Sequence, residues 1–342
     1  MNRMEHHGRP KRLEAERRMV TSLVMVWLRP ARLMPVALMA MACLLPVALN
    51  GYLVYLAGLA LVYVIVAVGF TIILGWSGQL AFMSAAFFGL GAYAGGAAAA
   101  WGGAPAELAL IAGGAAGVLL GSAFGALAVR LRRYYLAIAT LSLMYVLDYC
   151  YRNFPAWTGG VSGFPVPQPA FLLLLGREVA TDYGKYYVGL ALALLAYLSA
   201  RSGQTTSLGR AWRVIRSDER VAMSLGIDVY RGKLSAFAIS AGFLGLAGAW
   251  FVFLTGRFLP ETFGLNELLF DFVILVVGGL GSLNGAVIGA VILVLAREYL
   301  RTFPGISELL FGLVLLATVL FLPRGIYGTP AARFRWLREG VV

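Results

Sequence analysis

The chain has 342 residues, of which 60% are hydrophobic and 13% charged, whereas a soluble domain carries roughly 45–50% apolar and about 25% charged residues. No soluble fold can bury so much apolar surface, so the composition excludes a soluble protein and predicts an integral membrane protein. The net charge of +12 does not call for nucleic acid, because membrane proteins retain Lys and Arg on their cytoplasmic side.

Residues 1–32 are polar and basic and show no small-residue cleavage site, so we expect a cytoplasmic extension rather than a signal peptide. Residues 33–322 form the predicted transmembrane domain, and residues 323–342 a cytoplasmic tail. The fold class predicted is all-α, a polytopic transmembrane helical bundle of eight to ten spans, some broken or re-entrant. The apolar segments lie near 33–49, 51–74, 80–100, 106–129, 134–150, 186–200, 234–254, 267–282, 285–299 and 307–322.

The basic residues predict the orientation of these spans. With the N-terminus inside, most Lys and Arg residues fall in the tails and in two loops, at 130–133 and 201–233, which is the bias expected of cytoplasmic segments. Both termini are therefore predicted to be cytoplasmic. Residues 151–185 would form an external loop, whose Gly and Pro residues either shape an entrance or simply connect two spans.

Glycine interrupts or lines several apolar segments. Breaks at 75–78 and 278–285 are candidate pathway elements, since irregular backbone at membrane depth survives only inside protein or along a water-filled cavity; the alternative is a plain turn between helices. A separate ladder predicts a flat face against which another helix can pack closely. Its members are Gly113, Gly117, Gly121 and Gly125.

The charged island at 207–233 predicts two short helices with a bend. Leu208, Trp212 and Ile215 follow helical spacing, with arginines on the other faces. Ser217 is expected to cap the second helix, and Gly226 to end it.

This island either docks into a soluble partner or lies on lipid headgroups as a solvated face. We favour docking, with Trp212 as the apolar anchor, because buried aromatic residues often dominate interfaces. The predicted docking residues are Leu208, Gly209, Arg210, Trp212, Arg213, Arg216, Asp218, Glu219, Leu225 and Gly226.

The sequence offers little for catalysis. The two histidines, His6 and His7, lie in the N-terminal tail, and Cys43 and Cys150 lie far apart in apolar runs. No G-x-x-x-x-G-K-[ST] phosphate-binding loop is present. We therefore predict no enzyme activity, no metal site and no cofactor bound by this chain.

Several polar residues in or near apolar spans are candidates for a transport pathway. Asp271 and Asp148 either face a cavity or pair with a partner, because intramembrane charges are costly; Asp148 alternatively reaches the outer interface. Ser77, Gln79 and Ser84 lie at or just beyond the first glycine break. They contact a substrate or satisfy backbone groups that the break exposes.

Six stretches together identify a family. They are LGWSGQLAFMSAAFFGLGAY (74–93), YYLAIATL (134–141), WTGGVSGF (157–164), the run from SLGRAWRVIRSDERVAMSLGIDVYRGK to LGLAGAW (207–250), VVGGLGSLNGAVIGA (276–290) and FLPRGIYG (321–328). In this order they resemble the LivM-type permeases of bacterial ATP-binding-cassette importers for branched-chain amino acids, a family that includes urea and amide permeases. The resemblance covers most of residues 50–330.

The resemblance implies a multi-pass permease of the bacterial inner membrane. Its implied partners are a second, LivH-like permease, two cytoplasmic ATP-binding subunits that hold ATP and Mg, an external substrate-binding protein and membrane lipid. Residues 207–226 match the family's coupling helix, which sits in a groove of the ATPase. The candidate pathway residues are Ser77, Gln79, Ser84, Tyr145, Thr158, Gly159, Gly160, Glu267 and Asp271.

The chain departs from the family at two of these positions. Many members carry Gly-His or Gly-Gln where this chain has Met83 and Ser84, and many carry Glu where it has Tyr145. The substrate expected is a branched-chain or other hydrophobic amino acid. A stand-alone secondary transporter or channel, which would also use broken helices, is the alternative. An intramembrane enzyme would need a clustered His, Cys or paired-carboxylate site.

Overall fold

The computed structural model describes residues 49–301, apart from 132, 172–175 and 180, and a few residues outside this range (46, 309, 310, 312, 313, 316 and 325–327). Each apolar segment predicted between 51–74 and 285–299 coincides with a helix. The predicted spans at 33–49 and 307–322, both tails and Cys43 lie wholly or almost wholly outside the described residues.

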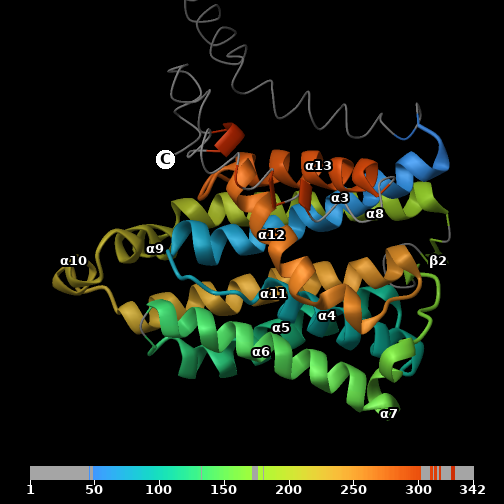
Figure 1. Ribbon diagram of the computed structural model, residues 1–342, viewed down its shortest axis with the longest axis horizontal. Helices are drawn as coiled ribbons and strands as arrows, with labels where there is room; N and C mark the ends of the chain where they lie inside the picture. Colours follow the sequence, from blue (N-terminus) through green and yellow to red (C-terminus); the bar gives the residue numbers. More distant parts are fainter. Residues whose placement is uncertain are drawn as a thin grey trace, which may run out of the picture.

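The long helices lie side by side, with α9 and α10 at one end of the bundle and α7 and β2 at the other (Figure 1). The predicted all-α fold is confirmed, apart from one two-residue antiparallel strand pair in the loop at 151–185. The helices are α3 (Gly51–Phe70), η1 (Thr71–Trp76), α4 (Ser84–Ala100), α5 (Ala106–Ala128), α6 (Arg133–Asn153), α7 (Pro155–Thr158), η2 (Gly160–Ser162), α8 (Asp182–Thr205), α9 (Ser207–Ser217), α10 (Glu219–Ser224), α11 (Val229–Thr255), η3 (Pro260–Phe263), α12 (Leu265–Gly278) and α13 (Leu283–Leu300), and the strands are β1 (Ala170–Phe171) and β2 (Arg177–Glu178).

Four helical segments among the described residues are long and apolar enough to cross a membrane: α3 with η1, α5, α11 and α13. In the most apolar stretches of α3 and α11, 83% and 78% of the residues are buried, whereas in those of α5 and α13 only 33% and 39% are. The core of the bundle is therefore built around α3 and α11, and α5 and α13 present apolar faces that suit lipid.

The glycine ladder lets α5 approach α11 closely, as predicted. A Cβ atom on Gly117 would lie 2.2 Å from the carbonyl oxygen of Ala241, and one on Gly113 would lie 2.5 Å from the Cβ atom of Ala249. Gly121 and Gly125 also face α11. Only glycine fits at such a contact, because a side chain would collide with the backbone of the neighbouring helix.

The first predicted break is also present. After Phe70 the helix widens into the π-helical turn η1, and residues 77–83 are not helical before α4 begins. Gly78 has a φ of 69°, in the left-handed region that favours glycine. At the second break, Gly279 and Gly281 have positive φ values and separate α12 from α13. Both glycine segments therefore interrupt helices; residues 77–83 of the first are buried or half-buried, whereas Leu280 in the second is 48% exposed.

The island at 207–233 forms the two predicted helices, α9 and α10, and Gly226 follows α10 with a φ of 76°. The predicted N-cap was wrong. Ser217 is the last residue of α9, where its hydroxyl bonds to the Val214 carbonyl, and the Asp218 side chain caps α10 by accepting from the Arg220 amide at 2.7 Å. Asp218 does this better because a carboxylate accepts a charge-assisted bond at a helix N-terminus.

The α5–α11 contact makes a test of packing possible. We expect Gly117→Ala to lower the free energy of unfolding of the detergent-solubilised protein by about 1–3 kcal/mol, the usual cost of overpacking. The melting temperature should fall accordingly. Gly114→Ala is the matched control, because its Cβ atom would lie 3.8 Å from the Gly242 carbonyl oxygen, an ordinary contact. Equal melting temperatures for the two variants would contradict the packing role of Gly117.

Candidate functional site

A polar cluster around the buried Glu267 joins three helices. Arg297 of α13 donates to Glu267 of α12 at 3.0 Å and to the Tyr63 hydroxyl of α3 at 3.1 Å. The Tyr63 hydroxyl donates to the second oxygen of the same carboxylate. The Arg297 guanidinium also lies over the ring of Phe270, 4.5 Å from its centroid. Both carboxylate oxygens of Glu267 therefore accept a hydrogen bond. This arrangement fits a structural clamp, a cluster that holds α3, α12 and α13 together.

Asp271 lies one helical turn from Glu267 and differs from it. Its side chain is 2% exposed, and neither carboxylate oxygen has a hydrogen-bond partner of normal geometry among the described residues. The hydroxyl of Ser84, at the start of α4, interacts with this carboxyl but makes no hydrogen bond of normal length and angle. A buried polar group without a hydrogen-bond partner is costly. Ser84 and Asp271 therefore form a buried polar position whose hydrogen-bonding groups the fold itself leaves unused.

The predicted residues of the first break satisfy the backbone. The Ser77 hydroxyl donates to the Ile73 carbonyl at 2.8 Å, and the Gln79 amide donates to Ser77 at 2.8 Å and to the Lys233 carbonyl at 3.1 Å. Of the two interpretations offered by the sequence, these contacts favour the structural one for Ser77. Gln79 leaves both open, because its buried Oε1 has no hydrogen-bond partner among the described residues. The contacts also connect the break to the first turns of α11.

Thr158, Gly159 and Gly160 lie at the opposite end of the bundle and form a turn. The Thr158 hydroxyl bonds to the Tyr151 and Phe154 carbonyls at 2.7 and 2.8 Å and accepts from the Gly160 amide at 3.2 Å. The glycines have φ values of 71° and 63°. The structure therefore does not bring these residues together with Asp271.

Tyr145 lies apart from the buried cluster as well. It is 53% exposed on the outer face of α6, whereas the adjacent Met144 packs with Leu268 of α12. Asp148, further along α6, pairs with Arg152 at 3.0 Å, and Arg152 also approaches Glu261 at 3.8 Å. This ion pair fits the alternative in which the Asp148 side chain reaches the outer membrane–water interface.

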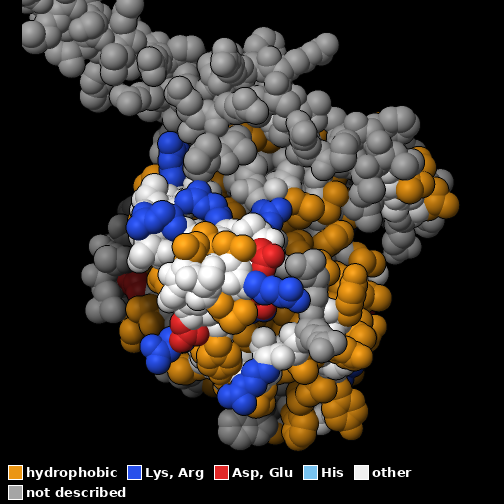
Figure 2. Space-filling model, turned by 90° about the vertical axis from the view of Figure 1, so that its left-hand side faces the viewer, with side chains coloured by type: hydrophobic (Ala, Val, Ile, Leu, Met, Phe, Trp, Pro, Cys, Tyr) orange, Lys and Arg blue, Asp and Glu red, His pale blue; other side chains and the backbone are white. Residues whose placement is uncertain are grey.

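The end of the bundle that carries α9 and α10 is rich in Lys and Arg side chains (Figure 2). Arg210 and Arg213 are exposed there, and in the part of the chain that the structure describes they donate to nearby carbonyls, those of Thr205 and Gln204. Leu225 is 66% exposed and Leu208 46%. Gly209 fits tightly against the end of α8, since its Cβ atom would lie 2.3 Å from the Gly203 carbonyl oxygen.

The anchor role predicted for Trp212 is wrong. Trp212 is 3% exposed, its indole donates to the Gly232 carbonyl at 2.9 Å, and its ring stacks on Trp76. It cannot reach a partner because it holds α9 against α11 and η1. Arg216 remains exposed, although its guanidinium donates to the Gly75 carbonyl at the first break.

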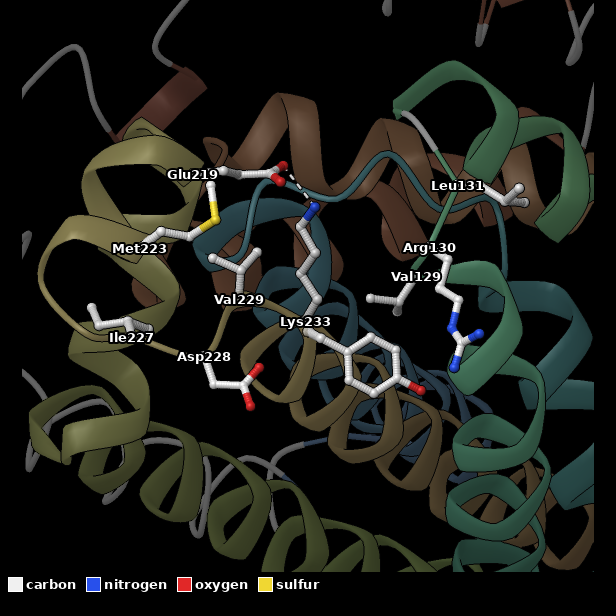
Figure 3. A pocket seen from close by; sticks show the side chains of 10 residues that line it. Val129, Arg130, Leu131, Glu219, Met223, Ile227, Asp228, Val229 and Lys233 are labelled. Atoms are coloured by element: carbon white, nitrogen blue, oxygen red, sulfur yellow. Dashed lines mark hydrogen bonds and ion pairs between the residues drawn. The ribbon is translucent and has the colours of Figure 1, made fainter.

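A pocket of about 640 Å³ lies beside α10 (Figure 3). It is lined by α10, the start of α11 and the link between α5 and α6, and its wall combines apolar Met223 and Ile227 with the ion pair of Glu219 and Lys233, 2.6 Å apart. The pocket is thus lined by a mixture of apolar and charged side chains, as protein interfaces commonly are.

Sequence reasoning missed four contributors to these sites. Tyr63 and Arg297 complete the clamp around Glu267, and Met223 and Lys233 line the pocket. The position of Arg297 in the apolar segment 285–299 was an available signal, since an intramembrane cation needs a partner. Nothing in the local sequence singles out Tyr63, which lies in an unbroken apolar helix.

Comparisons with known proteins identify the family of the chain. A family model described as the branched-chain amino acid transport system / permease component matches residues 52–322. The high-affinity branched-chain amino acid transport system permease protein LivM of Escherichia coli (strain K12) is 31% identical over 316 residues, 86% of this chain and 74% of its own length. LivM of Salmonella typhimurium is 30% identical over the same shares. LivH of Salmonella typhimurium is 32% identical over 130 residues, 36% of this chain and 40% of its own.

No solved structure matches the chain significantly. The family match nevertheless spans every helix from α3 to α13, both glycine breaks and the island that contains α9 and α10. The resemblance inferred from the six sequence stretches is confirmed. The chain belongs to the family of branched-chain amino acid transport system permease components.

Proposed function

We propose that this chain is the permease subunit of an ATP-driven importer for branched-chain or other hydrophobic amino acids. It lies in the inner membrane of a bacterium with both termini in the cytoplasm and forms half of the translocation pathway beside a second, related permease. Two separate ATPase subunits bind ATP and Mg in the cytoplasm, and an external binding protein delivers the solute. This chain carries no chemistry of its own.

The observation that carries the proposal is the exposed end of the bundle formed by α9 and α10. This helix pair presents Arg210, Arg213 and Leu225 to solvent and borders a pocket lined by apolar and charged side chains. A stand-alone carrier has no need for such a surface. The sequence contains no phosphate-binding loop, so the hydrolysis of ATP requires another chain, and this end is where that chain would dock.

The positions of the predicted pathway residues divide them by role. Asp271 and Ser84 form the unused buried polar position on α12 and α4, next to the first break. Glu267 belongs to the structural clamp with Tyr63 and Arg297. We propose that α12, between the clamp and the second break, borders the pathway and that Asp271 is its polar contact for the solute.

Reconstitution tests the proposed function directly. Vesicles that contain the chain with its partner permease, ATPase subunits and binding protein should accumulate radiolabelled leucine only when ATP is supplied on the ATPase side. Vesicles that contain the chain alone should not. Leucine uptake driven by an ion gradient without ATPase subunits would instead identify a secondary transporter.

The docking surface predicts an effect of charge reversal. Arg213→Glu should reduce the amount of ATPase subunit that co-purifies with the chain and make it more sensitive to salt, because charges at an interface rim govern association. Arg257→Glu is the control, since Arg257 is an exposed arginine at the opposite end that bonds to the Ser162 carbonyl. Equal recovery of ATPase with both variants would rule out docking through Arg213.

The two acids of α12 should behave in opposite ways. Asp271→Asn should leave thermal stability unchanged or raised, because it removes an unpartnered buried carboxyl, yet lower leucine uptake. Glu267→Gln should lower the free energy of unfolding by about 1.5 kcal/mol, because it removes the charge-assisted hydrogen bond from Arg297, whose side chain is 38% exposed. Thermal unfolding in detergent and uptake in vesicles measure both effects. A large loss of stability in Asp271→Asn would show that Asp271 is structural.

A further inference from the structure

The C-terminal end of α3 and η1 exposes backbone carbonyls. The last four carbonyls of a helix lack donors within the helix, and here the chain leaves helical geometry after Trp76. The Gly75 carbonyl is among these groups. It accepts a hydrogen bond from the guanidinium of Arg216, which comes from α9. A cation at a helix C-terminus is also favoured by the helix dipole, so a side chain of α9 caps the broken end of α3.

The second glycine break lies at the same place. A Cβ atom on Gly75 would lie 2.8 Å from the Cα atom of Gly281, so the two backbones touch. The Trp76 indole donates to the Gly281 carbonyl at 3.1 Å. A Cβ atom on Gly281 would lie 2.9 Å from Nη1 of Arg216. One guanidinium therefore contacts both breaks, although they are about 200 residues apart in sequence.

The attachment of α9 to this junction has a second point. Trp212 lies one helical turn before Arg216, and its ring stacks on Trp76 with 6.4 Å between the ring centroids. The stem of Arg216 packs against Gly78, whose Cβ atom would lie 2.7 Å from Cγ of Arg216. Trp212 and Arg216 both contact the junction. A shift of α9 would therefore strain both contacts.

We propose that Arg216 is a positioning residue that ties α9 to both glycine breaks, so that a displacement of α9 moves the α12–α13 turn and the α12 helix attached to it. The inference rests on the proposed function, because it takes a partner ATPase as the source of that displacement. It reverses the expectation that Arg216 pairs with a charge on the ATPase. The planar guanidinium suits this task, since several N–H groups in a fixed fork can serve adjacent backbone groups, which a Lys ammonium does less well.

The coupling ratio of the full transporter tests the inference. Proteoliposomes that contain the complete complex and binding protein receive ATP, and the probe is radiolabelled leucine. Arg216→Met should retain its ATPase subunits and hydrolyse ATP within about twofold of the unmodified complex, while leucine taken up per ATP falls about fivefold or more, the lower range of coupling between sites. Arg216→Lys should restore part of this ratio because it keeps a cation at the helix end.

Arg231→Met is the matched control. Arg231 is an arginine of the same region whose side chain is 86% exposed and pairs with Asp228 at 3.2 Å. Its replacement should leave leucine uptake per ATP unchanged. An unchanged ratio in Arg216→Met would overturn the inference, and so would loss of the ATPase subunits from that variant, because Arg216 would then act at the interface.

Gly281→Ala approaches the same junction from the other break and is used if the Arg216→Met chain itself does not fold. Its methyl group would press on the Arg216 guanidinium, and its φ of 91° disfavours alanine, while the surface of α9 is untouched. We expect the same loss of leucine uptake per ATP, and an unchanged ratio would overturn the inference. If the unmodified complex shows no ATP-driven uptake, the proposed function itself fails, which is a distinct result.

Discussion

The close contact of α4 and α5 with α11 is the constraint on which the bundle depends. In lipid there is little hydrophobic gain from bringing two apolar helices together, so association relies on packing and on short backbone distances. Here both partners contribute small residues. Gly117 meets the backbone of Ala241, and a Cβ atom on Gly248 would lie 1.9 Å from the Phe88 carbonyl oxygen of α4. This contact places α11 in the core and positions the start of α11 beside α9.

Irregular backbone in this fold is concentrated where other parts of the chain can protect it. The π-helical end of α3 meets the glycine turn between α12 and α13, and Arg216 and Trp76 provide the donors that the free carbonyls need. The same junction lies next to α9 and α10, the helix pair at the charged end of the bundle. A break enclosed in this way keeps its shape without water, and it connects a surface available to partners with α12.

Much of this organisation could be predicted from the sequence. The apolar segments located the helices, because a bilayer requires about 20 apolar residues for a span, and the four-residue glycine spacing identified the packing face of α5. The breaks at Gly78 and Gly281 were evident because glycine is the residue that tolerates positive φ. The bend after Ser217 followed from charge and capping patterns, although the cap itself proved to be Asp218.

Only the tertiary structure decided which polar residues share an environment. Glu267 and Asp271 look alike in sequence, yet Glu267 meets Arg297 and Tyr63, which lie on other helices, while Asp271 meets no such partner among the described residues. Trp212 and Arg216 belong to an amphipathic pattern that suggested an external partner, but Trp212 is buried against α11 and the Arg216 guanidinium donates to the Gly75 carbonyl of the same chain. Helical periodicity determines which residues share a face. It does not determine what that face meets, because the neighbours come from distant segments whose approach is set by backbone contacts between glycines.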